Sequence, residues 1–306
     1  MKDSRAVFVA ADIHLPDGAD NFRGVLALAA SETVIPDTVL LGGDCVGGGK
    51  PPAPGTSDPE QLRRWQPEYC LDDVKAQVRA CFGERTQVFC TYGSHDKNEL
   101  CGGFFCGGAS CGDFLLYGIS FSQMRFADDA QLAETGYDAP DAVCGGAETA
   151  VQRFLQWDAE LGDSAPLLVM SHIPLHFNRH DNRGAYAWSC ALNRVSEHRS
   201  VVVFFAHNHS SERRNNIDRA HYLVPVGAEM AVQCAEKEES AEVRLGFTYL
   251  NAGYILNGCA TVLTFSDSSG AGEYDTLTIK RCALDPQEEK FGDTDFRSPY
   301  ALSLKG

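Results

Sequence analysis

Near its N-terminus the chain reads Val7-Phe8-Val9-Ala10-Ala11-Asp12-Ile13-His14, an apolar run that ends in two polar side chains. Such a run predicts a buried strand, and side chains two residues apart project to the same side of an extended chain. Asp12 and His14 therefore reach together into the space beyond the strand end, where a metal ion can be bound. The apolar run 201–205 is followed, after Ala206, by the similar stretch His207-Asn208-His209. The two stretches predict a sheet whose strand ends carry a common site.

Three further clusters lie between these stretches, and each follows a run predicted to be a strand. They are Gly42-Gly43-Asp44, Gly93-Ser94-His95-Asp96 and Ser171-His172. Five of the nine histidines fall in the five clusters, a pattern that is hard to obtain by chance. Carboxylates and imidazoles suit Mn, Fe or Zn better than a soft metal. We therefore predict a hydrolytic site that holds two divalent ions of this kind.

The positions of the ligands indicate how the two ions share them. In two-metal hydrolases the ions lie about 3.5–4 Å apart, polarise the phosphoryl group and generate hydroxide at neutral pH. Asp44 stands alone at its strand end and is the natural bridge. The candidate ligands of the first ion are Asp12, His14 and His209, and those of the second are His172 and His207. A single Asp or His after a strand is more often structural, so the prediction depends on the joint pattern.

Charge and composition limit the partners of the protein. The chain has 306 residues and a formal net charge of −16, which argues against binding of a nucleic-acid polymer or an anionic membrane. A small phosphorylated substrate remains compatible, because bound cations dominate the field in a metal site. No apolar run approaches the roughly 20 residues that span a bilayer. No export signal is visible before the first strand, so we expect a cytoplasmic protein, although an exported mature form would look the same.

The twelve cysteines are an even number, but without an export signal we expect them to be reduced. Cys101, Cys106 and Cys111 recur every five residues, which is not a zinc-finger spacing. Cys45 lies beside Asp44, yet no base is identifiable that would activate it. We interpret it as a packing residue.

The order of predicted elements indicates the fold class. Strands and helices alternate in the first two thirds of the chain, with strands at 7–11, 38–41, 87–92, 166–170 and 201–205, and helices around 22–29, 58–82, 148–161 and 185–197. A strand-rich part follows from about residue 221, with strands at 222–226, 244–250, 261–265 and 277–280. Residues 97–146 have a weaker pattern, apart from a strand-like stretch at 114–121, and are predicted to be an insertion or cap. We predict one mixed α/β domain over 1–306 that contains a second sheet.

In their order and spacing the clusters resemble the signature of the calcineurin-like metallophosphoesterase superfamily: D-x-H, G-D, G-N-H-[DE], a strand-end H, and G-H-x-H. The resemblance extends over roughly residues 7–210, and Asn251-Ala252-Gly253 looks like part of the closing sheet of that family. It implies a four-layer α-β-β-α sandwich of two mixed sheets. It also implies the ligand assignment given above, with His95 near the leaving group as a proton donor or stabilising cation, and Asp96 orienting the ring of His95.

Two positions depart from the family pattern. Ser94 stands where the family has a metal-binding Asn, and Ala206 stands where it has Gly. A hydroxyl is shorter than an amide, so we expect the second ion to bind more weakly than the first, through water, or not at all. The change to Ala206 is milder and is expected to be only steric.

A polar loop follows His172 and includes the candidate substrate-binding residues His176, Asn178, Arg179 and Arg183. Arginine binds phosphate in a bidentate way, so these side chains would hold the non-reacting part of a substrate. A solvated loop with helix caps explains the same residues equally well.

The sequence therefore predicts a metal-dependent hydrolase of a small phosphorylated molecule, with a lean towards a phosphodiester or nucleotide-like substrate. A phosphomonoesterase is the nearest alternative. A non-catalytic binding module on the same fold is an alternative of a different class, and Ser94 would be its first sign. The oligomeric state is not indicated.

Overall fold

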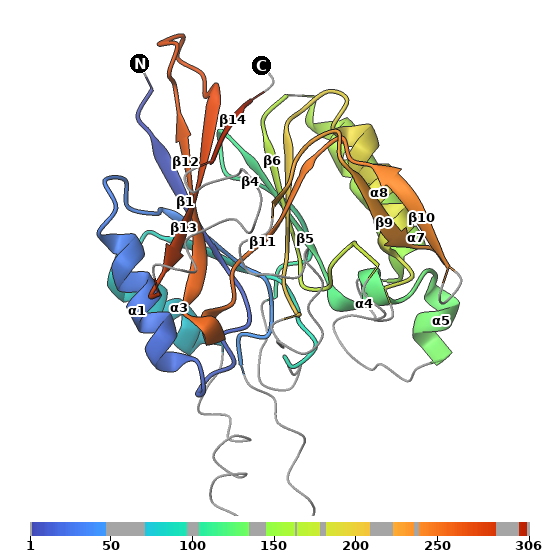
Figure 1. The fold of residues 1–306 in the computed structure, drawn as a ribbon, viewed down its shortest axis with the longest axis horizontal. Coiled ribbons are helices and arrows are strands. Elements are labelled where there is room, and N and C mark those ends of the chain that lie inside the picture. The colour runs from blue at the N-terminus through green and yellow to red at the C-terminus, as the bar shows by residue number, and fades with distance from the viewer. Residues whose placement is uncertain are drawn as a thin grey trace, which may run out of the picture.

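The computed structural model describes residues 2–46, 71–96, 104–134, 145–162, 164–177, 182–208, 223–235, 239–285 and 300–304. Two six-stranded mixed sheets pack face to face, and helices lie on their outer faces (Figure 1). The four-layer sandwich implied by the resemblance is therefore confirmed.

The first sheet has the strand order β14-β13-β12-β1-β2-β3. Its parallel half consists of β1 (Arg5–Ala10), β2 (Thr38–Leu41) and β3 (Gln87–Cys90). Its antiparallel half consists of β12 (Cys259–Ser266), β13 (Thr276–Ala283) and β14 (Tyr300–Ser303). Because β1, β2 and β3 are parallel, the loops that follow them emerge at one edge of the sheet.

The second sheet has the strand order β4-β5-β6-β7-β11-β8. Four parallel strands form its centre, namely β5 (Leu115–Ile119), β6 (Leu167–Ser171), β7 (Val201–Phe205) and β11 (Thr248–Asn251). The antiparallel edge strands are β4 (Gly107–Ser110) and β8 (Leu223–Val224). A separate hairpin is formed by β9 (Glu229–Gln233) and β10 (Ser240–Arg244).

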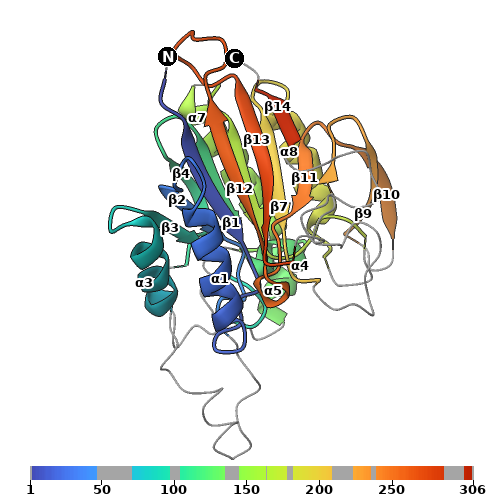
Figure 2. The same cartoon turned by 60° about the vertical axis from the view of Figure 1, so that its left-hand side comes forward.

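Helices cover the two outer faces, as two views of the molecule show (Figures 1 and 2). The helices α1 (Ala19–Ala30) and α3 (Leu71–Phe82) pack on the first sheet. The helices α7 (Ala147–Leu161) and α8 (Ala185–Val195) pack on the second sheet with the short helix α4 (Phe121–Arg125). The chain also forms α5 (Asp129–Glu134) and the 3-10 helix η3 (Ile255–Asn257). None of the helices in the described part of the chain has the length and apolar composition needed to cross a bilayer.

The sequence of strand β7 explains why the two sheets pack against each other, because the strand has apolar side chains on both faces. Val202 and Phe204 point into the cluster between the sheets, whereas Val201, Val203 and Phe205 point into the cluster beneath the helices. All five side chains are buried, as the uniformly apolar sequence predicts. Each such side chain contributes about 1.5–3 kcal/mol of transfer free energy, so the strand ends are fixed in space by a rigid core.

Most of the predicted strands are present, and the largest difference lies in the C-terminal part. The stretch 244–250, predicted as one strand, is divided, because β10 ends at Arg244 and β11 begins at Thr248. Gly246 lies between them, where a Cβ would come within 2.1 Å of Ser196 Oγ at the end of α8. The chain is therefore bent here by close contact with the helix. Strands β4, β9 and β14 were not predicted, nor was β10 apart from its last residue, Arg244. They are short, and β4, β10 and β14 are mostly half-exposed or exposed.

The segment predicted as an insertion or cap contains part of the second sheet. Strand β5 lies within that sheet beside β6, and all five of its residues are buried. Residues 58–70 of the predicted helix 58–82 lie outside the described residues, as do 97–103 and 135–144 of the predicted insertion.

Candidate metal centre

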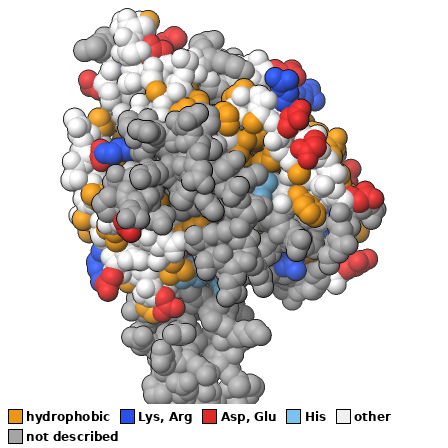
Figure 3. Space-filling model, viewed as in Figure 1, with side chains coloured by type: hydrophobic (Ala, Val, Ile, Leu, Met, Phe, Trp, Pro, Cys, Tyr) orange, Lys and Arg blue, Asp and Glu red, His pale blue; other side chains and the backbone are white. Residues whose placement is uncertain are grey.

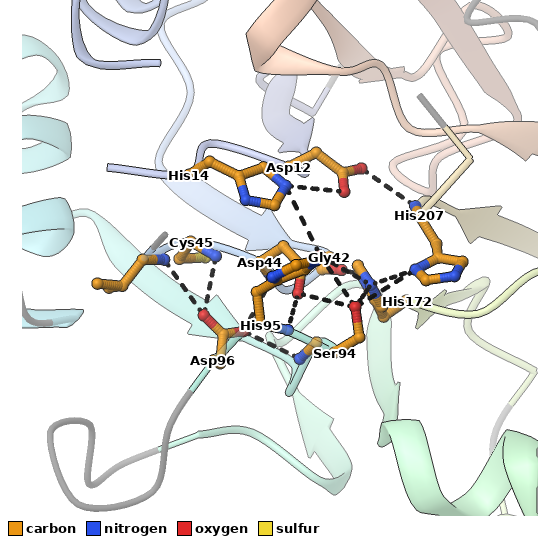
Figure 4. Close-up of polar contacts among 12 residues, drawn as sticks. Asp12, His14, Gly42, Asp44, Cys45, Ser94, His95, Asp96, His172 and His207 are labelled. Carbon is orange, nitrogen blue, oxygen red and sulfur yellow. Dashed lines mark hydrogen bonds and ion pairs between the residues drawn. The ribbon is translucent and has the colours of Figure 1, made fainter. Parts of the chain in front are cut away.

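The loops that follow β1, β2, β3, β6 and β7 converge at one place (Figure 4). Among the described residues, the non-glycine residues with positive φ are Asp12 (54°), His14 (47°), Asp44 (50°) and His207 (77°). Each of the four is a candidate metal ligand. L-residues adopt this region rarely, and strained backbone of this kind gathers at functional sites. The backbone therefore singles out the same residues as the sequence pattern.

Two glycines allow the loops after β2 and β3 to cross. A Cβ on Gly93 would lie 2.4 Å from Asp44 Oδ1. Gly43 has φ +82°, and a Cβ there would lie 2.6 Å from Gly93 Cα. Only glycine fits such an approach without displacing the loops, which explains the Gly-Gly-Asp and Gly-Ser-His stretches.

The first group of potential ligands contains Asp12, His14 and Asp44. His14 Nε2 lies 3.7 Å from Asp12 Oδ1 and 3.7 Å from Asp44 Oδ2. The other oxygen of Asp12 accepts a hydrogen bond of 3.1 Å from the backbone N–H of His207, which connects the two sheets at the site. Asp12 and Asp44 are almost completely buried.

The second group contains Asp44, His172 and His207. His172 Nε2 lies 3.2 Å from Asp44 Oδ2 and 3.1 Å from His207 Nδ1. His172 Nδ1 donates to the backbone oxygen of Gly42 over 2.8 Å, which leaves Nε2 to face the site. A second-shell hydrogen bond of this type orients a metal-binding imidazole. Asp44 is common to both groups, as expected for a bridging carboxylate.

His209 was predicted to complete the first ligand set, and it lies outside the described residues. Ser94 is closer to the ligands than we expected. Its Oγ lies 3.2 Å from Asp44 Oδ2 and 3.4 Å from both His172 Nε2 and His207 Nδ1. The expectation that the second ion binds more weakly than the first, through water or not at all, stays a prediction.

Asp96 has a different role from the one we predicted. Its carboxylate accepts hydrogen bonds from the backbone N–H groups of Asp44, Cys45, Val46 and Gly93, at 2.8–3.2 Å, instead of orienting the ring of His95. It thereby ties the loop that carries Asp44 to the loop that carries Ser94. His95 is exposed; its backbone N–H donates to Asp44 Oδ1 over 2.6 Å, and its ring lies 5.1 Å from that of His14.

Charges in the centre depend strongly on one another. Burial disfavours the Asp44 carboxylate, but the charge and hydrogen bond of His172, with His14 and His95, outweigh burial and hold the pKa of Asp44 well below its usual range. Burial likewise disfavours the imidazolium of His172, yet Asp44 raises the pKa of His172 to about 9. Burial and the charge of Asp44 raise the pKa of Asp96 to about 6, against the pull of its backbone hydrogen bonds.

The residues fit a pair of divalent metal ions. The donors are carboxylate oxygens and imidazole nitrogens, they occur as two groups that share one carboxylate, and they are fixed by strained backbone. This set suits Mn, Fe or Zn. Cys45 does not belong to it, because the thiol lies in the core at 3.0 Å from Cys90 Sγ. That hydrogen bond and burial raise the pKa of the Cys45 thiol, which argues against a nucleophilic role.

Two of the predicted substrate residues, His176 and Arg183, lie within the described part of the chain. That His176 contacts substrate stays a prediction; its side chain is 1% exposed, and its Nδ1 lies 2.9 Å from the hydroxyl of Tyr249. The His176 ring packs instead against Phe205 in the core. Arg183 is half-exposed on the turn before α8, and Asn178 and Arg179 lie outside the described residues.

One residue that supports the site had no signal in the sequence. Arg281 on β13 is fully buried, and its Nη2 donates to the backbone oxygen of Asn251 over 2.6 Å. The turn that follows Asn251 pairs with the strand end of β1, through Ala11 N–H to Gly253 O and Leu256 N–H to Asp12 O. A buried arginine thus supports the backbone of Asp12 through the turn that follows Asn251.

Comparison with known proteins places the chain in a family. The family model of the calcineurin-like phosphoesterases matches residues 6–211, and the chain belongs to this family. No curated protein matches the sequence closely enough to count as a relative.

Two solved structures are similar to the chain at low identity. One is an uncharacterised protein from Streptococcus pneumoniae, described as a predicted phosphoesterase, with 8% identity over 99% of both chains and a TM-score of 0.35. The other is a mutant of Vps29 from Entamoeba histolytica, with 13% identity over 92% of this chain and 94% of that chain, and a TM-score of 0.36.

Proposed function

We propose that this protein hydrolyses phosphate esters with a dinuclear metal centre. The observation that carries the proposal is Asp44, whose buried carboxylate is common to two groups of potential ligands. One carboxylate shared by two groups of potential ligands allows two ions to act on one phosphoryl group.

The residues of the chain have distinct parts in this reaction. When bound, the ions polarise the phosphoryl oxygens and supply hydroxide at neutral pH. Asp12, His14, Asp44, His172 and His207, with the predicted ligand His209, would hold them. His95 is exposed beside the ligands and would donate a proton to the leaving oxygen. Asp96 fixes the relative positions of the loops that carry Asp44 and Ser94, through hydrogen bonds from four backbone N–H groups to its carboxylate.

The substrate is proposed to be a small phosphorylated molecule, and we lean towards a phosphodiester or a nucleotide-like compound. The family and the residues of the site are equally compatible with a monoester. The preference for a diester therefore depends on the expectation that the polar loop after His172 and the segment 97–146 enclose a leaving group. A nucleic-acid polymer is not expected. On the described part of the face in Figure 3, blue basic side chains lie in separate spots among red acidic ones and form no continuous patch.

The test compares hydrolysis of bis-p-nitrophenyl phosphate and p-nitrophenyl phosphate by metal-depleted protein to which Mn²⁺, Fe²⁺ or Zn²⁺ is added. Turnover that needs added metal and vanishes in Asp44→Asn supports the proposal. A strong preference for the monoester would overturn the lean towards diesters but leave the metal-dependent reaction in place.

A non-catalytic binding module is the second candidate, because Ser94 replaces the residue that the family uses as a ligand. Against it, the structure retains five ligand positions that converge. If neither ester is hydrolysed with any of these ions while a protein partner copurifies, the binding module is the better conclusion.

A further inference from the structure

Cys45 and Cys90 form a pair of thiols beside the candidate metal centre, and the proposed reaction does not use them. Their sulfur atoms are 3.0 Å apart, and both side chains are buried. Cys45 directly follows Asp44 in the loop after β2, and Cys90 is the last residue of β3. The contact therefore joins the loop that carries the shared carboxylate to the strand that leads to Ser94 and His95.

The backbone around Cys45 is tied to other residues of the centre. The N–H of Cys45 donates to Asp96 Oδ1 over 2.9 Å (Figure 4). The backbone oxygen of Cys45 accepts from the N–H of Leu15 over 3.1 Å. The backbone oxygen of Asp44 accepts from the N–H of His14 over 2.8 Å. A displacement of Cys45 is therefore transmitted to Asp44 and to the loop that carries His14.

The two sulfur atoms need little movement to form a bond. An S–S bond is about 2.0 Å long, so an approach of about 1 Å would join the atoms that now lie 3.0 Å apart. We propose that Cys45 and Cys90 are a site of reversible disulfide formation, and that the cross-link weakens metal binding at Asp44. Formation of the disulfide is independent of the proposed function, but its effect on hydrolysis rests on that function.

A hydroperoxide is the class of oxidant that the reaction requires, and hydrogen peroxide is the simplest example. One thiol sulfur takes an oxygen atom from the peroxide: an S–O bond forms, the O–O bond breaks, and water leaves with the thiol proton. The second sulfur then attacks the resulting sulfenic acid: the S–S bond forms, the S–O bond breaks, and a second water leaves with the second thiol proton. Two electrons pass from the two sulfurs to the peroxide, and a dithiol reductant returns them.

Burial determines how this pair reacts. Cys45 is 0% exposed and Cys90 is 1% exposed, so an oxidant reaches them only when the loop opens locally. Oxidation is therefore expected to be slow and to favour a small oxidant such as hydrogen peroxide over a bulky disulfide. Once one sulfur is a sulfenic acid, the neighbouring thiol is close enough to capture it before further oxidation.

The cross-link is expected to disturb the shared ligand. Groups in a binding site have to be held within about 0.5 Å of their working positions, and closing the bond requires an approach of about 1 Å. Asp44 is the neighbour of Cys45 in the chain, so part of this movement reaches its carboxylate. Metal affinity is expected to fall by at least about tenfold, as it does when groups that orient the ligands are changed.

The experiment treats metal-depleted, full-length protein with hydrogen peroxide and then removes the peroxide. Mass spectrometry of peptides identifies the disulfides, and calorimetric titration with Zn²⁺, which has no redox chemistry of its own, measures metal affinity. Oxidised wild type is expected to yield a peptide pair joined through Cys45 and Cys90 and to bind Zn²⁺ at least about tenfold more weakly. Dithiothreitol is expected to remove the cross-link and restore the affinity.

Two variants and one matched control separate this pair from the other cysteines. Cys90→Ala and Cys45→Ala each remove one sulfur of the pair, and both are expected to keep their affinity for Zn²⁺ after the same oxidation. The control is Cys282→Ala, because Cys282 is also buried, on β13, and this variant should respond as wild type does. Thermal unfolding checks that each variant is folded. The cross-link and its reversal are read in wild type itself, so the test stands even if an alanine variant does not fold.

Each result decides for or against the proposal. The cross-linked peptide with a reversible loss of affinity in wild type, and no loss in the folded Cys90→Ala or Cys45→Ala variant, supports it. Absence of the cross-linked peptide overturns it. An unchanged affinity in cross-linked wild type, or an equal loss in the alanine variants, overturns it as well. If reduced wild type binds Zn²⁺ but hydrolyses neither ester with any of the three ions, the proposed function fails while the redox site stands. If reduced wild type binds no metal, both proposals fail.

Discussion

The described part of the protein contains two clusters in which a buried aspartate faces histidine, at opposite ends of the same pair of strands; in the second cluster the histidine, His198, is exposed. After β6 and β7, Asp44 Oδ2 lies 3.2 Å from His172 Nε2. Before β6 and β7, Asp158 on α7 lies 3.1 Å from His198 Nε2 and 2.9 Å from Arg199 Nε. Distances alone do not distinguish the two clusters.

The clusters differ in backbone conformation and in the cation that faces the carboxylate. Asp158 lies within a regular helix and is paired with the permanently charged Arg199, which is 1% exposed and also donates to the backbone oxygen of Ala165. Asp44 has positive φ and faces imidazoles, which are cations only when protonated. A carboxylate neutralised by arginine needs no further ion, whereas imidazoles can exchange their protons for metal. The comparison separates a structural ion pair from a candidate metal centre.

The same substitution is expected to lower the rate of hydrolysis in one cluster and the stability of the fold in the other. The loss of hydrolysis is the largest effect that we predict. Asp44→Asn removes the shared ligand and is expected to lower metal-dependent hydrolysis by about a thousandfold or more. Asp158→Asn leaves the Arg199 cation without its carboxylate and should destabilise the fold by about 3 kcal/mol. Steady-state rates, metal content and denaturant unfolding are measured for both variants.

Asp158→Asn should retain wild-type metal content and a rate within about twofold of wild type below its unfolding temperature, because Asp158 lies at the opposite end of β6 and β7 from the candidate ligands and shares no partner with them. The comparison breaks down if Asp158→Asn loses metal, or if Asp44→Asn keeps its full activity.

The next largest effect concerns His95. If it protonates the leaving oxygen, His95→Ala should slow hydrolysis of an alkyl ester by about a hundredfold. Hydrolysis of a p-nitrophenyl ester should change little, because that leaving group departs without a proton. Rates with the two kinds of ester are compared in wild type and variant. An equal loss with both esters would assign His95 to binding or positioning instead.

Asp96 is expected to act through the position of the ligands. Asp96→Asn places an amide NH₂ where two backbone N–H groups donate, so metal affinity should fall by about 10–100-fold. The matched control is Asp267→Asn, because Asp267 also accepts backbone N–H bonds, from Lys2 and Gly272, but in the β12–β13 turn. Calorimetric metal titration checks both variants. Equal affinity in Asp96→Asn and wild type would show that the loops hold their register without the carboxylate.

The smallest effect is a dependence of metal binding on pH. Asp44 raises the pKa of His172 to about 9, so the metal-free imidazole is protonated below that pH and must lose its proton to bind an ion. Affinity should rise with pH by up to about tenfold per unit until pH 9 and then level off. Titrations at pH 7 in two buffers of different ionisation enthalpy report the released proton. Identical heats in the two buffers would contradict this account.

The central part of the fold could be predicted from the sequence because buried parallel strands are continuous apolar runs. Strands β2 and β7 have the predicted bounds, and both are apolar nearly throughout. Strand β4, with the sequence Gly-Gly-Ala-Ser, has no hydrophobic pattern and is held by pairing with β5, which only tertiary structure reveals. Short strands at edges depend on their neighbours more than on their own residues.

For the site, the ligand types and their order were readable, because strand ends with carboxylates and imidazoles have a recognisable spacing. The roles of supporting residues were not. Asp96 binds four backbone groups that belong to two separate loops, and the burial of His176 depends on contacts with Tyr249 and Phe205. Arg281 acts through a turn formed 30 positions earlier in the chain. These contacts join residues that are distant in sequence, so no local pattern indicates them.

The most direct test of the account is anomalous diffraction from crystals of the protein grown with zinc. The account predicts two anomalous peaks, both within bonding distance of the Asp44 carboxylate, one beside Asp12 and His14 and the other beside His172 and His207. A map with no peak at Asp44, or with peaks only at other places on the protein, would contradict it.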